Sequence, residues 1–311
     1  MDDVYDLLRK IRDFINEPRM KESLLKNKPF FYQLCSCMDM VEDSQSAIDA
    51  FGKRGKKESP KGEVYLEIFG LLQSLFVQQD AAFNLAESLQ FEVTLKEYPR
   101  LKEIREIRNN AAGHPTKSDR RDPPSWNFII QHSMGYESFE VMCWHSPEGH
   151  TNISVQTKQI ISDQREYVVD ILRKTYSEIK RRDNEHKAKF KMKKIEDIFP
   201  GTIGYMCEKM GTAVDHLNEM NLGEYGATGL LNVLEKFEAE LKERKINIDT
   251  YPGIELTFTE LRYPLEKLKQ HFLRTTTLDK EEGYIFVDFV RNKMRELQEM
   301  AKELDKEFAS E

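Results

Sequence analysis

Hydrophobic residues recur every three or four positions along most of the chain, which is the spacing of one face of an α-helix. The longest such segment covers residues 63–91, and its hydrophobic positions span an arc of roughly 160°, wider than the roughly 100° stripe of a surface helix. A helix with so wide an apolar face packs against more than one neighbour, which can include a second copy of the chain. The same spacing predicts helices over residues 3–15, 30–51, 96–112, 157–190, 202–217, 227–244, 252–273 and 280–308.

The hydrophobic pattern changes between residues 118 and 157. Three segments there, 126–130, 136–145 and 152–156, are rich in aromatic and β-branched residues, which favours strands over a helix. A Ser-Pro-Glu-Gly-His-Thr segment separates the second from the third and reads as a turn. We therefore predict a small antiparallel β insert within a helical protein.

Two breaks in the pattern suggest how the chain is divided. Pro18 and Pro29 bracket a segment that reads as a polar linker, and a basic stretch within residues 187–200 ends in a Pro-Gly break. The 311 residues are enough for two domains of ordinary size. The sequence thus predicts a mainly α fold, in which residues 1–195 form a helical bundle with the β insert at about 118–157, and residues 196–311 form a C-terminal helical bundle.

Composition and charge narrow the class of protein. Hydrophobic residues make up 39% of the chain and charged residues 32%, which is typical of a soluble globular protein. A net charge of −7 argues against a generally basic nucleic-acid-binding surface but allows a local one. No segment approaches 18 uninterrupted apolar residues, the N-terminus does not resemble a secretory signal, and four cysteines do not form a disulfide framework. We expect a cytoplasmic protein with no membrane partner.

Residues 101–115 combine a helical pattern with a fixed end. Gly113 tolerates the left-handed conformation common at helix C-termini, and Pro115 cannot continue a helix, so the helix should end there and hold His114 at its end. At about 100° per residue, Arg108 falls on the hydrophobic face of this helix. An arginine on such a face costs free energy unless an anion or a paired group meets it.

Arg108 and His114 therefore form a candidate site. The guanidinium stays charged, whereas the imidazole titrates near neutral pH, so this pair suits phosphate chemistry, in which one group neutralises charge and the other moves protons. A purely structural interpretation is also open. In that case His114 caps the turn, and Arg108 extends to solvent or pairs with an acid such as Glu103.

The residues Arg108 and Asn109, four further residues and His114 resemble the motif of HEPN ribonucleases, which consists of Arg, a polar residue, a short spacer and His. Residues 65–85 also resemble the long helix that precedes this motif in HEPN-like bacterial proteins. The resemblance covers roughly residues 30–182 and does not extend to the C-terminal third.

This resemblance implies an antiparallel homodimer in which Arg108 and His114 of both copies meet in one cleft. The implied activity is cleavage of single-stranded RNA without a metal or other cofactor, with the 2′-OH of the RNA as nucleophile. His114 would act as acid or base, Arg108 would stabilise charge on the phosphate, and Asn109 would orient the phosphate or the histidine. The resemblance further implies a bacterial toxin, defence or stress-response effector with an antitoxin or regulatory protein as partner. Some relatives carry a modifiable Tyr two residues after the His, where this chain has Thr116.

Other residues are candidates for binding RNA or supporting the site. Gln79 lies within the hydrophobic arc of the long helix, either as a satisfied core amide or as a group that helps to orient the Arg–His site. Lys180, Arg181 and Arg182 belong to a basic run that could contact RNA phosphates, although a solvated helix face explains them equally well.

Two alternatives to catalysis by the Arg–His pair remain. Cys143, His145 and His150 cluster around the predicted turn, but a structural zinc site requires four ligands and the fourth is missing. The chain could also be a non-catalytic helical module that binds RNA or protein, working through its C-terminal bundle. The second domain and the acidic net charge favour this alternative, whereas the intact Arg-Asn-His set favours catalysis.

Overall fold

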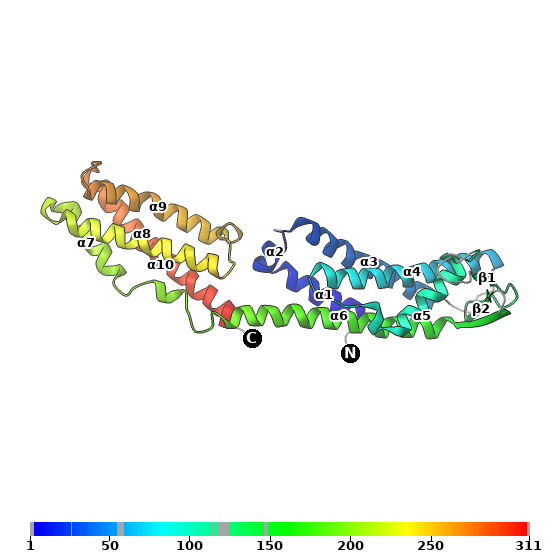
Figure 1. Cartoon of the computed structure of the whole chain (residues 1–311). Helices are drawn as coiled ribbons and strands as arrows, with labels where there is room; N and C mark the ends of the chain where they lie inside the picture. Colours follow the sequence, from blue (N-terminus) through cyan, green and yellow to red (C-terminus); the bar gives the residue numbers. More distant parts are fainter. Residues whose placement is uncertain are drawn as a thin grey trace. The chain divides into compact units, whose positions relative to one another are not determined.

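The computed structural model describes residues 3–25, 27–54, 59–113, 115–116, 125–145 and 149–309. Within them the chain is mainly α-helical with a small three-stranded antiparallel sheet (Figure 1), so the predicted fold class is confirmed. The chain divides into two compact units, Met1–Asn16 with Leu24–Lys180, and Glu17–Ser23 with Arg181–Glu311. This division falls inside helix α6 (Thr157–Ala188), before the domain boundary that the sequence places after residue 195. Independent folding of the two parts stays a prediction.

The first unit contains α1 (Val4–Asn16), α3 (Lys28–Gly52), α4 (Lys61–Ser88), α5 (Pro99–Arg108) and the first part of α6. Helices α3 and α4 run antiparallel, and their facing hydrophobic side chains are buried. Much of the wide apolar face predicted for residues 63–91 is therefore covered within the chain.

The predicted polar linker between Pro18 and Pro29 is wrong. Helix α2 (Pro18–Leu25) begins at the first of these prolines, and the second lies in the first turn of α3. Proline fits this position because its fixed φ suits a helix and its missing N–H would have no helical partner there. The two prolines thus begin helices rather than interrupt them.

The predicted helix over residues 96–112 consists of three pieces. A 3₁₀ turn, η1 (Leu95–Glu97), precedes α5, and a π-helical turn, η2 (Asn109–Gly113), follows it. Pro99 explains the first break, since it lies in the first turn of α5 and cannot donate a backbone hydrogen bond to the residues before it. The helical segment ends at Gly113, one residue after the predicted end, but Gly113 does not adopt the left-handed conformation that the sequence suggests for it.

The sheet has the order β1-β2-β3 and consists of β1 (Ser125–Ile129), β2 (Ser138–His145) and β3 (Gly149–Gln156). In the antiparallel register Trp126 lies opposite Trp144, and Asn127 lies opposite Cys143. The inner face, which carries the buried side chains, packs against η2. Figure 1 shows the sheet beside α5 in the first unit.

The second unit is a bundle of α7 (Ile203–Asp215), α8 (Met220–Glu243), α9 (Pro252–Phe272) and α10 (Lys280–Ala309) around one hydrophobic core. Helix α8 begins seven residues before the predicted start at 227. The added segment contains Gly223 and Gly226, which lower helix propensity in the sequence but permit close packing in the structure. A Cβ at Gly223 would lie 2.6 Å from the Cβ of Ala213, and one at Gly226 would lie 2.7 Å from the carbonyl oxygen of Met206. Across the described part of both units, no helix is long and apolar enough to cross a membrane.

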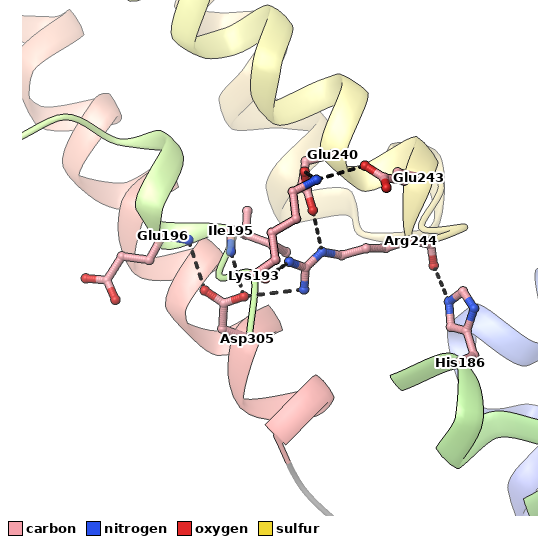
Figure 2. A network of polar contacts seen from close by, with 8 residues as sticks. All are labelled: His186, Lys193, Ile195, Glu196, Glu240, Glu243, Arg244 and Asp305. Carbon is pink, nitrogen blue, oxygen red and sulfur yellow. Dashed lines mark hydrogen bonds and ion pairs between the residues drawn. The ribbon is translucent and has the colours of Figure 1, made fainter. Parts of the chain in front are cut away.

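A buried arginine organises one end of this bundle (Figure 2). Arg244, at the C-terminal end of α8, is 0% exposed. Its Nε donates to Oε1 of Glu240 at 3.1 Å, and its Nη1 lies 3.5 Å from Oδ1 of Asp305 on α10. The guanidinium also lies over the rings of Phe190 and Phe308, at 4.9 and 5.0 Å from their centroids. Two carboxylates and two rings therefore surround one desolvated cation.

The same network fixes the segment that follows α6. Asp305 accepts hydrogen bonds from the backbone N–H groups of Ile195 at 2.8 Å and Glu196 at 2.9 Å, and Arg244 donates to the carbonyl of Lys193. At the end of α6, His186 donates through Nε2 to the carbonyl oxygen of Arg244 at 3.0 Å (Figure 2). These hydrogen bonds hold the segment after α6 against α8 and α10.

Candidate functional site

Arg108 lies at the junction between α5 and η2, where the helix widens from α to π geometry. Its Nη1 donates to Oδ1 of Asn109 at 3.0 Å, and its Nη2 donates to Oε1 of Gln73 on α4 at 2.9 Å. The guanidinium stands 4.4 Å above the ring of Phe76, which also belongs to α4. Two hydrogen bonds and one ring thus hold the half-buried side chain in a fixed orientation.

The groups that hold Arg108 are all neutral. Among the described residues, no carboxylate forms an ion pair with this guanidinium, and its Nε is buried without a hydrogen-bond partner. Glu103, which the structural interpretation of the sequence suggests as a partner, pairs with Arg100 instead. The positive charge of Arg108 is therefore positioned but not neutralised by its described neighbours.

Gly113 completes the immediate surroundings of Arg108. A Cβ at this glycine would lie 2.6 Å from Nη1 of Arg108 and 3.2 Å from Oδ1 of Asn109. The guanidinium therefore fills the space that any other side chain would need. π-Helical turns are uncommon and occur frequently at functional sites. His114, the next residue and the predicted acid–base group, lies outside the described residues, so its distance from Arg108 stays a prediction.

A second arginine, which the sequence analysis does not single out, accompanies Arg108. Arg105 donates through Nε to Oε1 of Gln79 at 2.7 Å and through Nη2 to Oδ1 of Asp80 at 2.5 Å. Its guanidinium lies 5.0 Å from the ring centroid of Phe76, so both arginines contact the same ring. The three-residue spacing of the arginines could have indicated this shared face. Asp80 neutralises Arg105, which distinguishes it from Arg108.

The structure places Gln79 against Arg105 and not against Arg108. Its Nε2 donates to Oε1 of Gln164 on α6 at 2.7 Å. Gln164 donates in turn to Gln78 at 3.0 Å, and Gln78 donates to Gln45 on α3 at 2.9 Å. Gln79 is thus a satisfied core amide in a buried chain of amides that joins three helices. Its link to Arg108 is indirect: Gln79 bonds to Arg105, and Arg105 and Arg108 both lie against the ring of Phe76.

Lys180, the one residue of the basic run that lies in the first unit, is not brought beside Arg108. The start of α5 meets α6 at Asp163, which accepts from Nε of Arg100 at 2.6 Å, and α5 then runs toward the N-terminal end of α6. Lys180 lies in the opposite direction, roughly 25 Å beyond Asp163 at 1.5 Å per residue. Arg181 and Arg182 belong to the second unit, where Arg181 pairs with Glu185.

The residues of the zinc alternative lie on two faces of the sheet. Cys143 and His145, two residues apart on β2, both lie on the inner face, whereas His150 lies opposite Trp144 on the outer face. Cys143 Sγ accepts a hydrogen bond from Nδ2 of Asn110 in η2 at 3.7 Å. No group of three or more His, Cys, Asp or Glu residues within the described ranges is arranged to hold a metal.

Asn127 is a further polar residue that the sequence analysis does not single out. Its backbone N–H donates to the carbonyl oxygen of Pro115 at 2.7 Å, so the chain just after the motif runs beside β1. The side chain is only 5% exposed, and neither of its amide atoms has a hydrogen-bond partner. Leaving a buried amide without a hydrogen bond costs free energy. The side chain of Asn127 and the Nε of Arg108 are thus two unsatisfied polar groups near the motif, the first beside Pro115 and the second within the motif itself. A polar residue at an inward-facing strand position is the signal that could have found it.

Comparison with models of known protein families, with curated proteins and with solved structures finds no match for this chain.

Proposed function

We propose that this protein is a metal-independent endoribonuclease of the HEPN type that cuts single-stranded RNA. One observation carries the proposal. The charge of Arg108 is held in place by Asn109, Gln73 and Phe76, which are all neutral, so that it remains available to an anion. A structural arginine is usually paired with a carboxylate, as Arg105 is with Asp80.

The proposed reaction takes its nucleophile from the RNA. One His114 removes the proton of the 2′-OH, whose oxygen forms a bond to the adjacent phosphorus while the bond from phosphorus to the 5′-oxygen breaks. His114 of the second copy supplies a proton to the departing 5′-oxygen. Arg108 binds the phosphate oxygens on which charge builds. The contact between Asn109 and Nη1 of Arg108 favours a role for Asn109 in orienting the arginine.

Cleavage of RNA in the presence of EDTA tests this function. We expect the purified chain to cut single-stranded RNA at neutral pH and to leave 2′,3′-cyclic phosphate and 5′-OH ends, because no step uses a bound hydroxide. DNA of the same sequence is the matched control and should stay intact, since it lacks the 2′-OH. Cleavage that requires added Mg²⁺, or equal cleavage of DNA, would contradict the mechanism. Tight binding of RNA without cleavage would favour the non-catalytic module.

The proposed site also requires two copies of the chain. On α4 the exposed side chains of Leu66 and Phe69 precede Gln73 along the same helix face, so an apolar strip leads toward the residue that holds Arg108. We expect light scattering at micromolar concentration to give twice the mass of one chain. Leu66→Asp should give a monomer, because it places a charge within the interface.

The control for this prediction is Leu256→Asp, which changes another exposed leucine, in the second unit, and should leave the dimer intact. A wild-type chain that stays monomeric would remove the composite site.

A further inference from the structure

The outer face of the three-stranded sheet carries both tryptophans of the chain. Trp126 on β1 lies directly opposite Trp144 on β2, and Phe128 follows two residues along β1 on the same face. Phe128 is 53% exposed and Trp144 is 44% exposed. The solvent face of an antiparallel sheet is normally polar, so a group of exposed rings there indicates an interaction surface.

The rings are arranged in a row across the three strands. His150 on β3 lies opposite Trp144, and their ring planes are within 10° of parallel with centroids 5.8 Å apart. Trp126, Trp144 and His150 thus occupy neighbouring positions on β1, β2 and β3. The outer face comprises Trp126, Phe128, Ser138, Glu140, Met142, Trp144, His150, Asn152, Ser154 and Gln156.

The outer face carries almost no charge. Glu140 is the only one of its ten residues with a formal charge at neutral pH, although the whole chain carries a net charge of −7. With a single carboxylate, the face repels a nucleic acid less than the rest of an acidic protein surface does. Asn152, Ser154 and His150 add hydrogen-bonding groups that can meet the edges of bases.

The composition of this face favours a nucleic acid over a protein as its partner. Its apolar side chains are aromatic apart from Met142, and it has no Leu, Ile or Val. Unpaired bases stack on flat rings, and each such contact contributes about 1–3 kcal/mol irrespective of sequence. Bases within a duplex are already stacked on one another and cannot use the same rings.

The face is continuous with the candidate site. Between Trp126 and Phe128 on β1, the N–H of Asn127 bonds to the carbonyl oxygen of Pro115, two residues after Gly113. The chain next to the Arg–His motif therefore borders the edge of the strand that carries two of the rings. A strand of RNA that stacks on the outer face reaches the motif by crossing this edge.

We infer that the outer face of the sheet is a base-stacking platform for single-stranded RNA, formed by Trp126, Phe128 and Trp144. The inference rests on the proposed ribonuclease function, because it assigns this face to the substrate of that same site. It also explains why two large rings, Phe128 and Trp144, remain exposed on this sheet.

Intrinsic tryptophan fluorescence tests the platform directly, because both tryptophans of the chain lie on this face. The probe is a 2′-O-methyl oligoadenylate of about twelve nucleotides, which the proposed nuclease cannot cut because its 2′-oxygens are blocked. We expect the strand to quench the fluorescence, and Trp144→Ala to weaken binding by about tenfold or more. Phe128→Ala should weaken it similarly. The matched control is Tyr32→Ala, an exposed aromatic residue on α3 of the same unit, which should bind as the wild type does.

Several outcomes would overturn the platform. These are unchanged affinity in both Trp144→Ala and Phe128→Ala, equal quenching by duplex RNA, or a loss of self-association in Trp144→Ala with RNA affinity unchanged, which would make the face a protein interface. The result is separable from the proposed function. A wild-type chain that binds the blocked strand but leaves ordinary RNA intact keeps the platform and loses the nuclease. A chain that cuts RNA equally well with and without Trp144 keeps the nuclease and loses the platform.

Discussion

Arg244→Ala should lower the free energy of unfolding of the second unit by about 3–5 kcal/mol, the usual cost of removing one partner from a buried ion pair. The change leaves the carboxylate of Asp305 without its cation and that of Glu240 with Lys193 alone, and it opens a space between the rings of Phe190 and Phe308. Denaturant unfolding of the full chain, followed by circular dichroism, measures the effect as a shift of the transition of this unit.

The control for this prediction is Arg262→Ala. Arg262 is an exposed residue of the same bundle, and its Nη2 lies 3.6 Å from Oε2 of Glu238. Because exposed ion pairs contribute little, its loss should change the free energy of unfolding by only about 0.5 kcal/mol. Equal effects of the two substitutions would mean that the network around Arg244 does not stabilise the bundle. The unit would then depend on its hydrophobic core alone.

Helical periodicity predicts much of this fold because it reports which residues are buried, and burial decides where amphipathic helices form. It fails where local signals have two meanings. Pro18 indicates a break from sequence alone but begins α2, and Gly223 and Gly226 lower helix propensity but allow α8 to approach its neighbours closely. Such positions depend on what lies beside the helix, which the local sequence does not contain.

The candidate site shows the same limit. Spacing predicts that Arg108 lies on an apolar face, yet its partners Gln73 and Phe76 come from another helix more than thirty residues away. The assignment of Gln79 to the core or to the site could not be made from its helical position, because the deciding contact is with Arg105. Residue type and local spacing can identify the charged group. Only the packing of α4 against α5 shows which neutral groups hold it.

His114→Ala should reduce the rate of RNA cleavage by at least about a hundredfold while the protein stays folded. General acid–base catalysis typically contributes about 10²–10⁴-fold, and an imidazole with a reference pKa near 6.5 exchanges protons at neutral pH without any large shift. Single-turnover cleavage measures the rate, and circular dichroism checks the fold. If His114→Ala cuts as fast as the wild type, this residue takes no part in the proton transfers.

Substitutions around the guanidinium separate its charge from its geometry. Arg108→Lys keeps the charge but loses the planar fork, so it cannot retain the bonds to Asn109 and Gln73 while binding two phosphate oxygens, and cleavage should fall strongly. Gly113→Ala keeps Arg108 itself but places a methyl group 2.6 Å from the present position of Nη1, which forces the guanidinium to move. It should therefore slow cleavage with little loss of stability, because the flexible end of an arginine can shift.

Gly211→Ala is the matched control for Gly113→Ala. Gly211 lies within α7 of the second unit, where an added Cβ meets only Cγ1 of Val287 at an ordinary 3.9 Å, so this substitution should leave the cleavage rate unchanged and stabilise the helix by up to about 1 kcal/mol. A Gly113→Ala enzyme that cuts as fast as the Gly211→Ala enzyme would show that the fixed position of Arg108 does not determine the rate. Its charge alone would then be sufficient, and Arg108→Lys should retain activity as well.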